Sequence, residues 1–295
     1  MAETLRGGLS LGLCGFGYWA HDIGGFEGNP DPALYKRWIA FGLLSSHSRL
    51  HGSGSFRVPW LIDSTGEADK ILKKFVNFKH TLLPYLYSMA IKSHKTGLPM
   101  LRATFLEFPE DRTAWHVDTQ YLLGDSLLVA PIFNGEGDVE YYVPKGRWYG
   151  LLDGRIREGP GYISENHGFD SIPVLLRPGS AVVIGAEASK AVYDWAQNFE
   201  LLINPTDDMS KEILVPNSEK PGDIPLALTV VASKTGVIVT VTQGSVKSDW
   251  KIAVAGKKLK EGLVDGSKRV EASLVRAKAS IAVAAGAKKA ELTYA

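Results

Sequence analysis

Apolar positions in the first fifty residues predict a strand, a helix and a second strand. Leu11–Trp19 is apolar along its length, as expected of a strand buried on both faces of a parallel sheet. Asp31 is a candidate N-cap with Pro32 at the first helical position, and a stripe at helical spacing follows. The stripe consists of Leu34, Tyr35, Trp38 and Phe41. The apolar stretch Phe41–Ser46 predicts the second strand, so this part of the chain has the order of an α/β sheet or barrel.

A long helix is predicted next. Ser64 and Glu67 form a candidate capping box at its start. Its apolar stripe, which advances by three or four residues at a time, consists of Ile71, Phe75, Phe78, Leu82, Leu86 and Met89. Pro84 is expected to kink the helix, and Gly97 is expected to end it.

Beyond residue 100 the pattern is typical of β-sandwiches. Short apolar runs bounded by Gly, Pro, Asn or Asp occur at Leu127–Phe133, Val139–Val143, Arg147–Leu152, Ile172–Leu176 and Ala181–Ile184. Aromatic residues become rarer after about residue 195, where Leu226–Ala232 and Val237–Thr242 predict a hairpin. We therefore expect an α/β region at 1–98, a sandwich at 99–190 and a second sandwich at 191–295.

The α/β region has too few strands to stand alone. Two strands cannot close a barrel, and they make a poor independent core. Either this region packs against the sandwiches, or the chain is the back part of a larger protein.

Composition excludes several classes of function. The chain has 295 residues with 33 Lys and Arg against 32 Asp and Glu, so it has no basic excess for a nucleic-acid backbone. One cysteine excludes an internal disulfide framework and a multi-cysteine zinc site. No apolar run is long enough for a membrane helix, and no signal peptide is recognisable, so the compartment is unknown and cytoplasmic by default.

Candidate chemistry begins in the segment from Trp19 to Phe26, which reads WAHDIGGF. Asp22 follows the first predicted strand, at the end where α/β sheets and barrels bind ligands. Aromatic faces and a carboxylate that accepts hydroxyl protons are the parts of a sugar site. The alternative is that Asp22 caps the following turn in an aromatic-rich core.

A second set of polar residues, HSRLHG, follows the second predicted strand. His47 and His51 have a spacing that binds zinc on a helix, but here they follow a strand and have no third ligand, so no metal is expected. Arg49 is a natural counter-ion for Asp22, and His51 could donate to a sugar hydroxyl. The alternative is an Asp–Arg pair that only joins two adjacent strands.

Several motifs in order resemble the C-terminal half of glycoside hydrolase family 31. They read GLSLGLCGFGYWAHDIGGFEG, YKRWIAFGLLSSHSRLHG, FRVPW, LLPYLY, GDSLLVAPIF and GRWYGLLDG. HDIGGF and HSRLHG are most similar to the α-xylosidase branch, and α-glucosidases are more distant. The resemblance spans residues 1–185.

This resemblance implies the fold class α/β plus all-β, with the C-terminal remnant of a (β/α)8 barrel followed by two β-sandwich domains. It implies a retaining hydrolase that releases α-linked xylose or glucose from non-reducing ends, without a metal or an organic cofactor. Such enzymes need a nucleophile and an acid/base about 5–5.5 Å apart. The α-xyloside or α-glucoside oligosaccharide is then the expected partner, with no nucleic acid or membrane.

Individual residues match the family's sugar-binding positions. Asp22 matches the carboxylate that binds hydroxyls in the −1 subsite, and Phe26 its hydrophobic neighbour. Arg49 matches the arginine beside that carboxylate, and His51 the histidine that hydrogen-bonds the sugar. Trp19 is expected in the pocket wall.

The resemblance places both catalytic carboxylates upstream of Met1, because the Trp-x-Gly-Asp type motif of the acid/base is missing. No catalytic residue is therefore expected in this chain, and its activity alone is doubtful. Glu27 or Asp31 could supply a second carboxyl, although nothing in the family supports either. The alternatives are a non-catalytic carbohydrate-binding or β-sandwich interaction protein, and association with a separate N-terminal half or with a second copy.

Overall fold

Two helices and two short parallel strands form the beginning of the chain. In the computed structural model, which describes residues 1–266, 268–270, 273–275 and 278–295, α1 (Ala2–Leu13) is followed by β1 (Asp22–Ile23). After α2 (Pro32–Leu43), β2 (Arg49–Leu50) pairs in parallel with β1. The predicted order of strand, helix and strand is confirmed, but each strand has only two residues and lies later in the chain than predicted.

Both predicted strand positions in this region are wrong. Leu11 and Leu13 belong to α1, where they are 44% and 48% exposed, while its buried face repeats at helical spacing and consists of Leu5, Gly8, Leu9 and Gly12. The stretch Phe41–Ser46 begins inside α2, which is buried from Tyr35 to Leu43. A helix buried on all sides has a continuous apolar run and cannot be told from a buried strand by periodicity alone.

Side-chain carboxylates accept hydrogen bonds from backbone N–H groups at the starts of α2 and α4. Asp31 is the N-cap of α2, as predicted, and its carboxylate accepts from Leu34 N at 2.9 Å. The predicted Ser64–Glu67 capping box is wrong, because α4 (Glu67–Thr96) follows α3 (Pro59–Ile62) with Gly66 as its N-cap. Asp63 accepts from Ala68 N at 2.9 Å and so satisfies a donor of the first turn. The predicted stop at Gly97 is confirmed.

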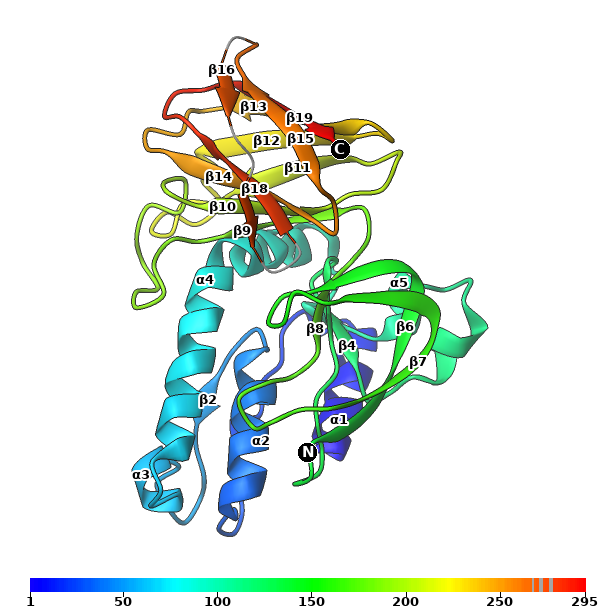
Figure 1. The fold of residues 1–295 in the computed structure, drawn as a ribbon. Helices are drawn as coiled ribbons and strands as arrows, with labels where there is room; N and C mark the ends of the chain where they lie inside the picture. The colour runs from blue at the N-terminus through cyan, green and yellow to red at the C-terminus, as the bar shows by residue number, and fades with distance from the viewer. Residues whose placement is uncertain (267, 271–272, 276–277) are drawn as a thin grey trace. The chain divides into compact units, whose positions relative to one another are not determined.

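One six-stranded sheet follows α4, in the order β3-β4-β5-β8-β6-β7. Its strands are β3 (Leu101–Arg102), β4 (Tyr121–Leu123), β5 (Leu127–Val129), β6 (Asp138–Gly150), β7 (Ile156–Asn166) and β8 (Val174–Leu176). The short helices α5 (Thr104–Glu107) and η1 (Arg112–His116) lie between β3 and β4. Two runs predicted as separate strands form the single long strand β6 (Figure 1).

Two further sheets contain the strands after residue 179. A five-stranded sheet has the order β17-β18-β14-β10-β9, and a six-stranded sheet has the order β11-β12-β13-β19-β15-β16. The strands of the first are β9 (Ser180–Ile184), β10 (Glu200–Asn204), β14 (Trp250–Ala255), β17 (Ser273–Val275) and β18 (Lys278–Val283). Those of the second are β11 (Ser210–Val215), β12 (Leu226–Ala232), β13 (Gly236–Gln243), β15 (Leu259–Val264), β16 (Lys268–Val270) and β19 (Lys289–Tyr294). The predicted hairpin is confirmed as β12 and β13.

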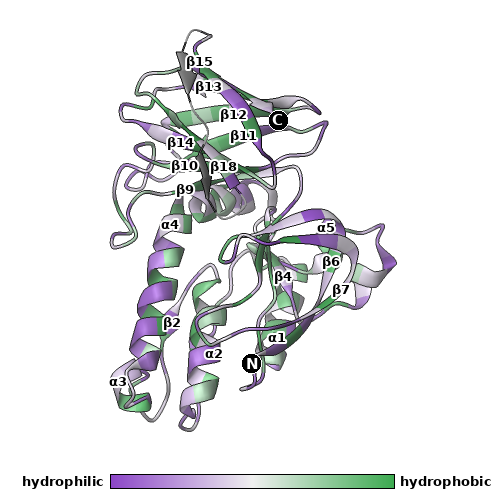
Figure 2. Cartoon of the chain, in the orientation of Figure 1, coloured by the Kyte–Doolittle hydropathy of each residue, from purple (hydrophilic) through white to green (hydrophobic). Residues whose placement is uncertain are grey.

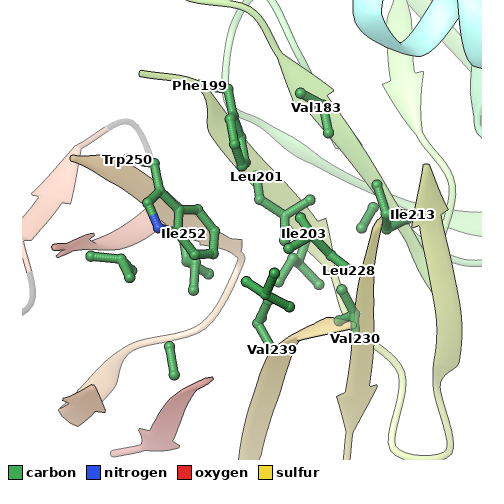
Figure 3. Packing of buried hydrophobic residues seen from close by; sticks show 14 of the residues in the cluster. Val183, Phe199, Leu201, Ile203, Ile213, Leu228, Val230, Val239, Trp250 and Ile252 are labelled. Carbon is green, nitrogen blue, oxygen red and sulfur yellow. The ribbon is translucent and has the colours of Figure 1, made fainter. Parts of the chain in front are cut away.

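Alternating side chains from these two sheets form a common core. Leu201 and Ile252 come from the five-stranded sheet, and Leu228 and Val239 come from the other (Figure 3). Figure 2 shows the corresponding hydrophobic colouring along β10 and β12. This is the layered packing of a β-sandwich.

The chain divides into two compact units that are not continuous in sequence. The first contains residues 1–79, 92–146 and 158–175, and the second contains residues 80–91, 147–157 and 176–295. The domain ranges expected from the sequence stay a prediction.

Candidate functional site

Asp22 and Arg49 lie opposite each other on the two parallel strands. Their Cα atoms are register partners, and Arg49 Nε donates to Asp22 Oδ1 at 2.5 Å. The Asp22 side chain is 12% exposed, whereas the Arg49 side chain is 62% exposed. The carboxylate is therefore held from one side by a cation that stays accessible to solvent.

Phe26 and His51 lie where the chain leaves these strands. Their ring centroids are 5.6 Å apart with planes tilted by 35°. Phe26 is 48% exposed and His51 is exposed, and Ser53 N donates to Phe26 O at 2.7 Å. Four of the five predicted residues thus form two contacting pairs, an ion pair on the strands and a ring pair after them.

Arg57, which was not predicted as a site residue, holds the loop that carries Phe26. Arg57 is only 2% exposed, and its guanidinium donates to Gly25 O at 3.1 Å and to Gly28 O at 2.5 Å. Gly25 has a positive φ of 82°, so the loop takes a turn that suits glycine. FRVPW contains the residue, but no hydrophobic period predicts that an arginine there is buried.

Trp19, the fifth predicted residue, packs against Gly8 of α1. The residue is 8% exposed, and an added Cβ at Gly8 would lie 2.2 Å from its ring. Ser46 Oγ donates to Trp19 O at 3.0 Å, which connects the segments that lead to the two strands. Among the described residues, nothing accepts a hydrogen bond from the Trp19 indole nitrogen.

His21, beside Asp22 in sequence, packs between the strand segment and α2. Trp38 Nε1 donates to His21 Nδ1 at 2.7 Å, and the imidazole stacks on Phe41 at 4.2 Å. Burial lowers the pKa of His21 from 6.5 to about 4, and the charge of Asp22 only partly opposes this shift. The imidazole is therefore neutral at pH 7 and belongs to the packing behind the site.

This burial predicts a loss of stability in acid. Because the pKa of His21 is lower in the folded chain, the unfolded chain binds the extra proton between pH 6.5 and about 4. The contribution is complete above pH 6.5 and falls by about 3 kcal/mol as the pH approaches 4. Urea unfolding at pH 7 and pH 4.5 measures it. His21→Gln, which keeps an acceptor for Trp38, should show a shallower dependence on pH, and an unchanged dependence would contradict the assignment.

Other polar groups near the site are engaged elsewhere. His47 Nδ1 lies 3.2 Å from Ser46 Oγ, and within the described ranges no group of three His, Cys, Asp or Glu side chains could hold a metal ion. Glu27 accepts from Ser53 Oγ at 2.9 Å, and Asp31 caps α2.

Among the described residues, no helix combines the length and the apolar character that a membrane span requires.

Comparison with known proteins gives consistent relatives. An alpha-xylosidase of Emericella nidulans is 45% identical over 267 residues, which cover 85% of this chain and 34% of that protein. Alpha-xylosidase XylQ of Lactiplantibacillus pentosus is 45% identical over 204 residues (67% and 26%), and alpha-glucosidase 2 of Bacillus thermoamyloliquefaciens is 31% identical over 180 residues (60% and 23%). The chain therefore spans about a third or less of the length of these relatives.

Structural comparison supports the same assignment. The cycloalternan-forming enzyme of Listeria monocytogenes, solved in complex with a pentasaccharide substrate, superposes with a TM-score of 0.87 at 25% identity over 99% of this chain and 31% of that one. Residues 1–89 match the glycosyl hydrolases family 31 TIM-barrel domain, and residues 97–182 match the glycosyl hydrolase family 31 C-terminal domain. These matches confirm the expected fold class and the resemblance to α-xylosidases, and the chain belongs to glycoside hydrolase family 31.

Proposed function

We propose that this chain is part of a retaining α-glycosidase of the α-xylosidase type, which hydrolyses α-linked xylose or glucose at non-reducing ends. The observation that supports the proposal most directly is the ion pair of Asp22 and Arg49 on adjacent parallel strands, with Phe26 and His51 immediately after them. The more similar relatives are named alpha-xylosidases, which favours xylose. In this proposal, residues 1–98 are the barrel part, and 99–190 and 191–295 are the two sandwiches.

Each residue has a distinct task in holding a pyranose ring. Asp22 accepts hydrogen bonds from two sugar hydroxyls, since an ionised carboxylate has several acceptor sites. Arg49 orients that carboxylate and keeps free donors on its exposed side. Phe26 offers an apolar face to the C–H bonds of the sugar, His51 donates to a hydroxyl, and the Trp19 indole N–H is an unsatisfied donor in the wall.

The same contacts argue against Asp22 as a nucleophile. A retaining mechanism needs two carboxyl groups about 5–5.5 Å apart on opposite sides of the scissile bond. Asp22 is paired with Arg49, while Glu27 is bonded to Ser53 and Asp31 to the first turn of α2. We therefore propose that the chain binds the sugar without cleaving the bond.

Turnover of an aryl α-xyloside by the purified chain tests this proposal. The expected result is saturable binding of xylose or a xyloglucan oligosaccharide in calorimetric titration, with no release of the aryl group above buffer. Turnover that persists through further purification and is lost in Asp22→Ala would contradict the absence of a catalytic pair. Asp31→Asn serves as the control, because it changes a neighbouring carboxylate that only caps a helix.

A purely carbohydrate-binding protein is the alternative, and it uses the same five residues. The two functions differ in whether a second polypeptide restores cleavage. If co-expression with the N-terminal part of a family relative yields a complex that hydrolyses the xyloside, the enzymatic proposal holds. A stable complex that binds sugar without hydrolysing it favours the alternative.

A further inference from the structure

A hollow of about 400 Å³ lies on the two long strands β6 and β7, which run side by side in Figure 1. It is lined by Asp138, Val139, Glu140, Ser164, Glu165 and Asn166. None of these residues belongs to the elements that carry Asp22 and Arg49. The hollow is therefore separate in construction from the site described above.

Three successive cross-strand pairs lie on this face of β6 and β7, two polar pairs in the hollow and one tyrosine pair beyond its lining residues. Asn166 Nδ2 donates to Asp138 Oδ1 at 2.7 Å, and Ser164 Oγ donates to Glu140 Oε2 at 3.3 Å. The next pair consists of Tyr142 and Tyr162, with ring centroids 5.4 Å apart. Two hydrogen-bonded polar pairs are thus followed by an aromatic pair along one face of the strands.

The two tyrosines differ in exposure, which leaves one ring available. Tyr142 is 3% exposed, and its hydroxyl donates to Asp111 Oδ2 at 2.6 Å. Tyr162 is 55% exposed and rests against it. A buried, hydrogen-bonded tyrosine fixes an exposed one, so the outer ring costs little entropy to order when it binds a ligand.

A buried carboxylate supports the strand pair from its other face. The Glu165 side chain is 9% exposed, and its Oε2 lies 3.0 Å from Tyr141 OH and 3.1 Å from His167 Nε2. His167 Nδ1 in turn lies 2.8 Å from Ser171 Oγ. Because side chains alternate along a strand, this chain of hydrogen bonds lies on the face of β7 opposite Ser164 and Asn166, where it stabilises the strand pair.

A buried arginine binds the backbone of the loop after β7. Arg37 of α2 is 5% exposed and donates to His167 O and Gly168 O, both at 2.9 Å. It also donates to Asn134 O at 3.1 Å in the turn before β6. The turn before β6 and the loop after β7 are neighbours at one end of the strand pair, where His167 N donates to Gly137 O at 2.9 Å, so Arg37 fixes this end of the hollow to α2 before a ligand arrives.

We propose that this β6–β7 face is a second binding site for a neutral oligosaccharide. The exposed Tyr162 ring stacks on the C–H face of one sugar, and the Asp138–Asn166 and Glu140–Ser164 pairs accept and donate hydrogen bonds to the hydroxyls of the next. The carboxylates repel anionic sugars and phosphates. Tyr162 and Asn166 are four residues apart on β7, about 13 Å, which favours a chain of sugars over a single ring.

Affinity electrophoresis in native gels containing xyloglucan tests this site. The Asp22→Ala chain, in which the first site is disabled, should still be retarded relative to a gel without polysaccharide. Adding Tyr162→Ala should weaken this binding at least ~10-fold, because the stacking surface is lost. The isosteric pair Asp138→Asn and Glu140→Gln should weaken it as well, with an unchanged melting temperature.

Trp60→Ala is the matched control, because Trp60 is an exposed aromatic residue (66%) on α3, outside the hollow. It should leave the retardation unchanged. Equal retardation with and without Tyr162 would overturn the proposal, as would no retardation of Asp22→Ala or a retardation abolished by a chelator. Because this second site does not depend on Asp22, the electrophoresis result can be interpreted even if no sugar binds at the Asp22–Arg49 site.

Discussion

Methionine in place of Arg57 should unfold the loop of residues 24–28 and destabilise the first unit by about 3 kcal/mol or more. The guanidinium of the buried Arg57 donates to the carbonyls of Gly25 and Gly28, and Tyr35 OH donates to the Arg57 carbonyl at 2.6 Å. Methionine fills a similar volume but donates no hydrogen bond, so these oxygens lose a charged partner. For a unit of this size, the melting temperature should fall by roughly 6–12 °C.

Calorimetric melting, read together with sugar titration, separates this role from a direct contact. Arg49→Met is the matched control, because Arg49 is exposed and donates to Asp22. It should lower sugar affinity with little change in melting temperature. Arg57→Met should lower both, because Phe26 lies on the loop. A melting temperature of Arg57→Met within about 1 °C of the unaltered chain would contradict the role assigned to this residue.

Alanine in place of Asp22 should abolish measurable binding of a monosaccharide. A charge-assisted hydrogen bond contributes about 1.5–3 kcal/mol, so the loss of one such acceptor lowers affinity roughly 10- to 100-fold. Arg49, the partner left behind, is 62% exposed and is solvated by water after the change. We therefore expect an unchanged fold and a lost ligand.

Titration calorimetry with xylose measures the effect. Asp22→Asn keeps the shape and one acceptor oxygen, so it should retain more affinity than alanine. Asp31→Ala is the opposite control, because it removes the N-cap bond to Leu34 and should lower stability by about 1 kcal/mol with the affinity intact. Full affinity in Asp22→Ala would show that the carboxylate only joins the strands.

Local rules predicted the parts of the fold in which one residue determines the backbone. Asp31 followed by Pro32 starts α2, and Gly97 ends α4 with a positive φ. The first strands were misplaced because β1 and β2 have only two residues each, too few for any period to show. The capping box failed because the acceptor at the start of α4 is Asp63, one residue before the predicted Ser64.

The candidate site was predictable to the extent that it depends on which residues follow which strand. Asp22 and Arg49 are register partners at the starts of two parallel strands, and the residues after these strands meet at one edge, which brings Phe26 beside His51. Arg57 was not predictable in this way, because its role depends on backbone carbonyls about thirty residues earlier. The burial of Trp19 depends on its contact with Gly8, and no sequence pattern connects these two residues.

The central claim is that the ends of β1 and β2 bind a pyranose ring, and a titration of the ¹⁵N-labelled chain with xylose tests it most directly. We predict saturable shifts of the backbone amides of residues 22–26 and 49–53 that disappear in Asp22→Ala. Amide shifts that avoid both segments, or that persist unchanged in Asp22→Ala, would contradict the claim.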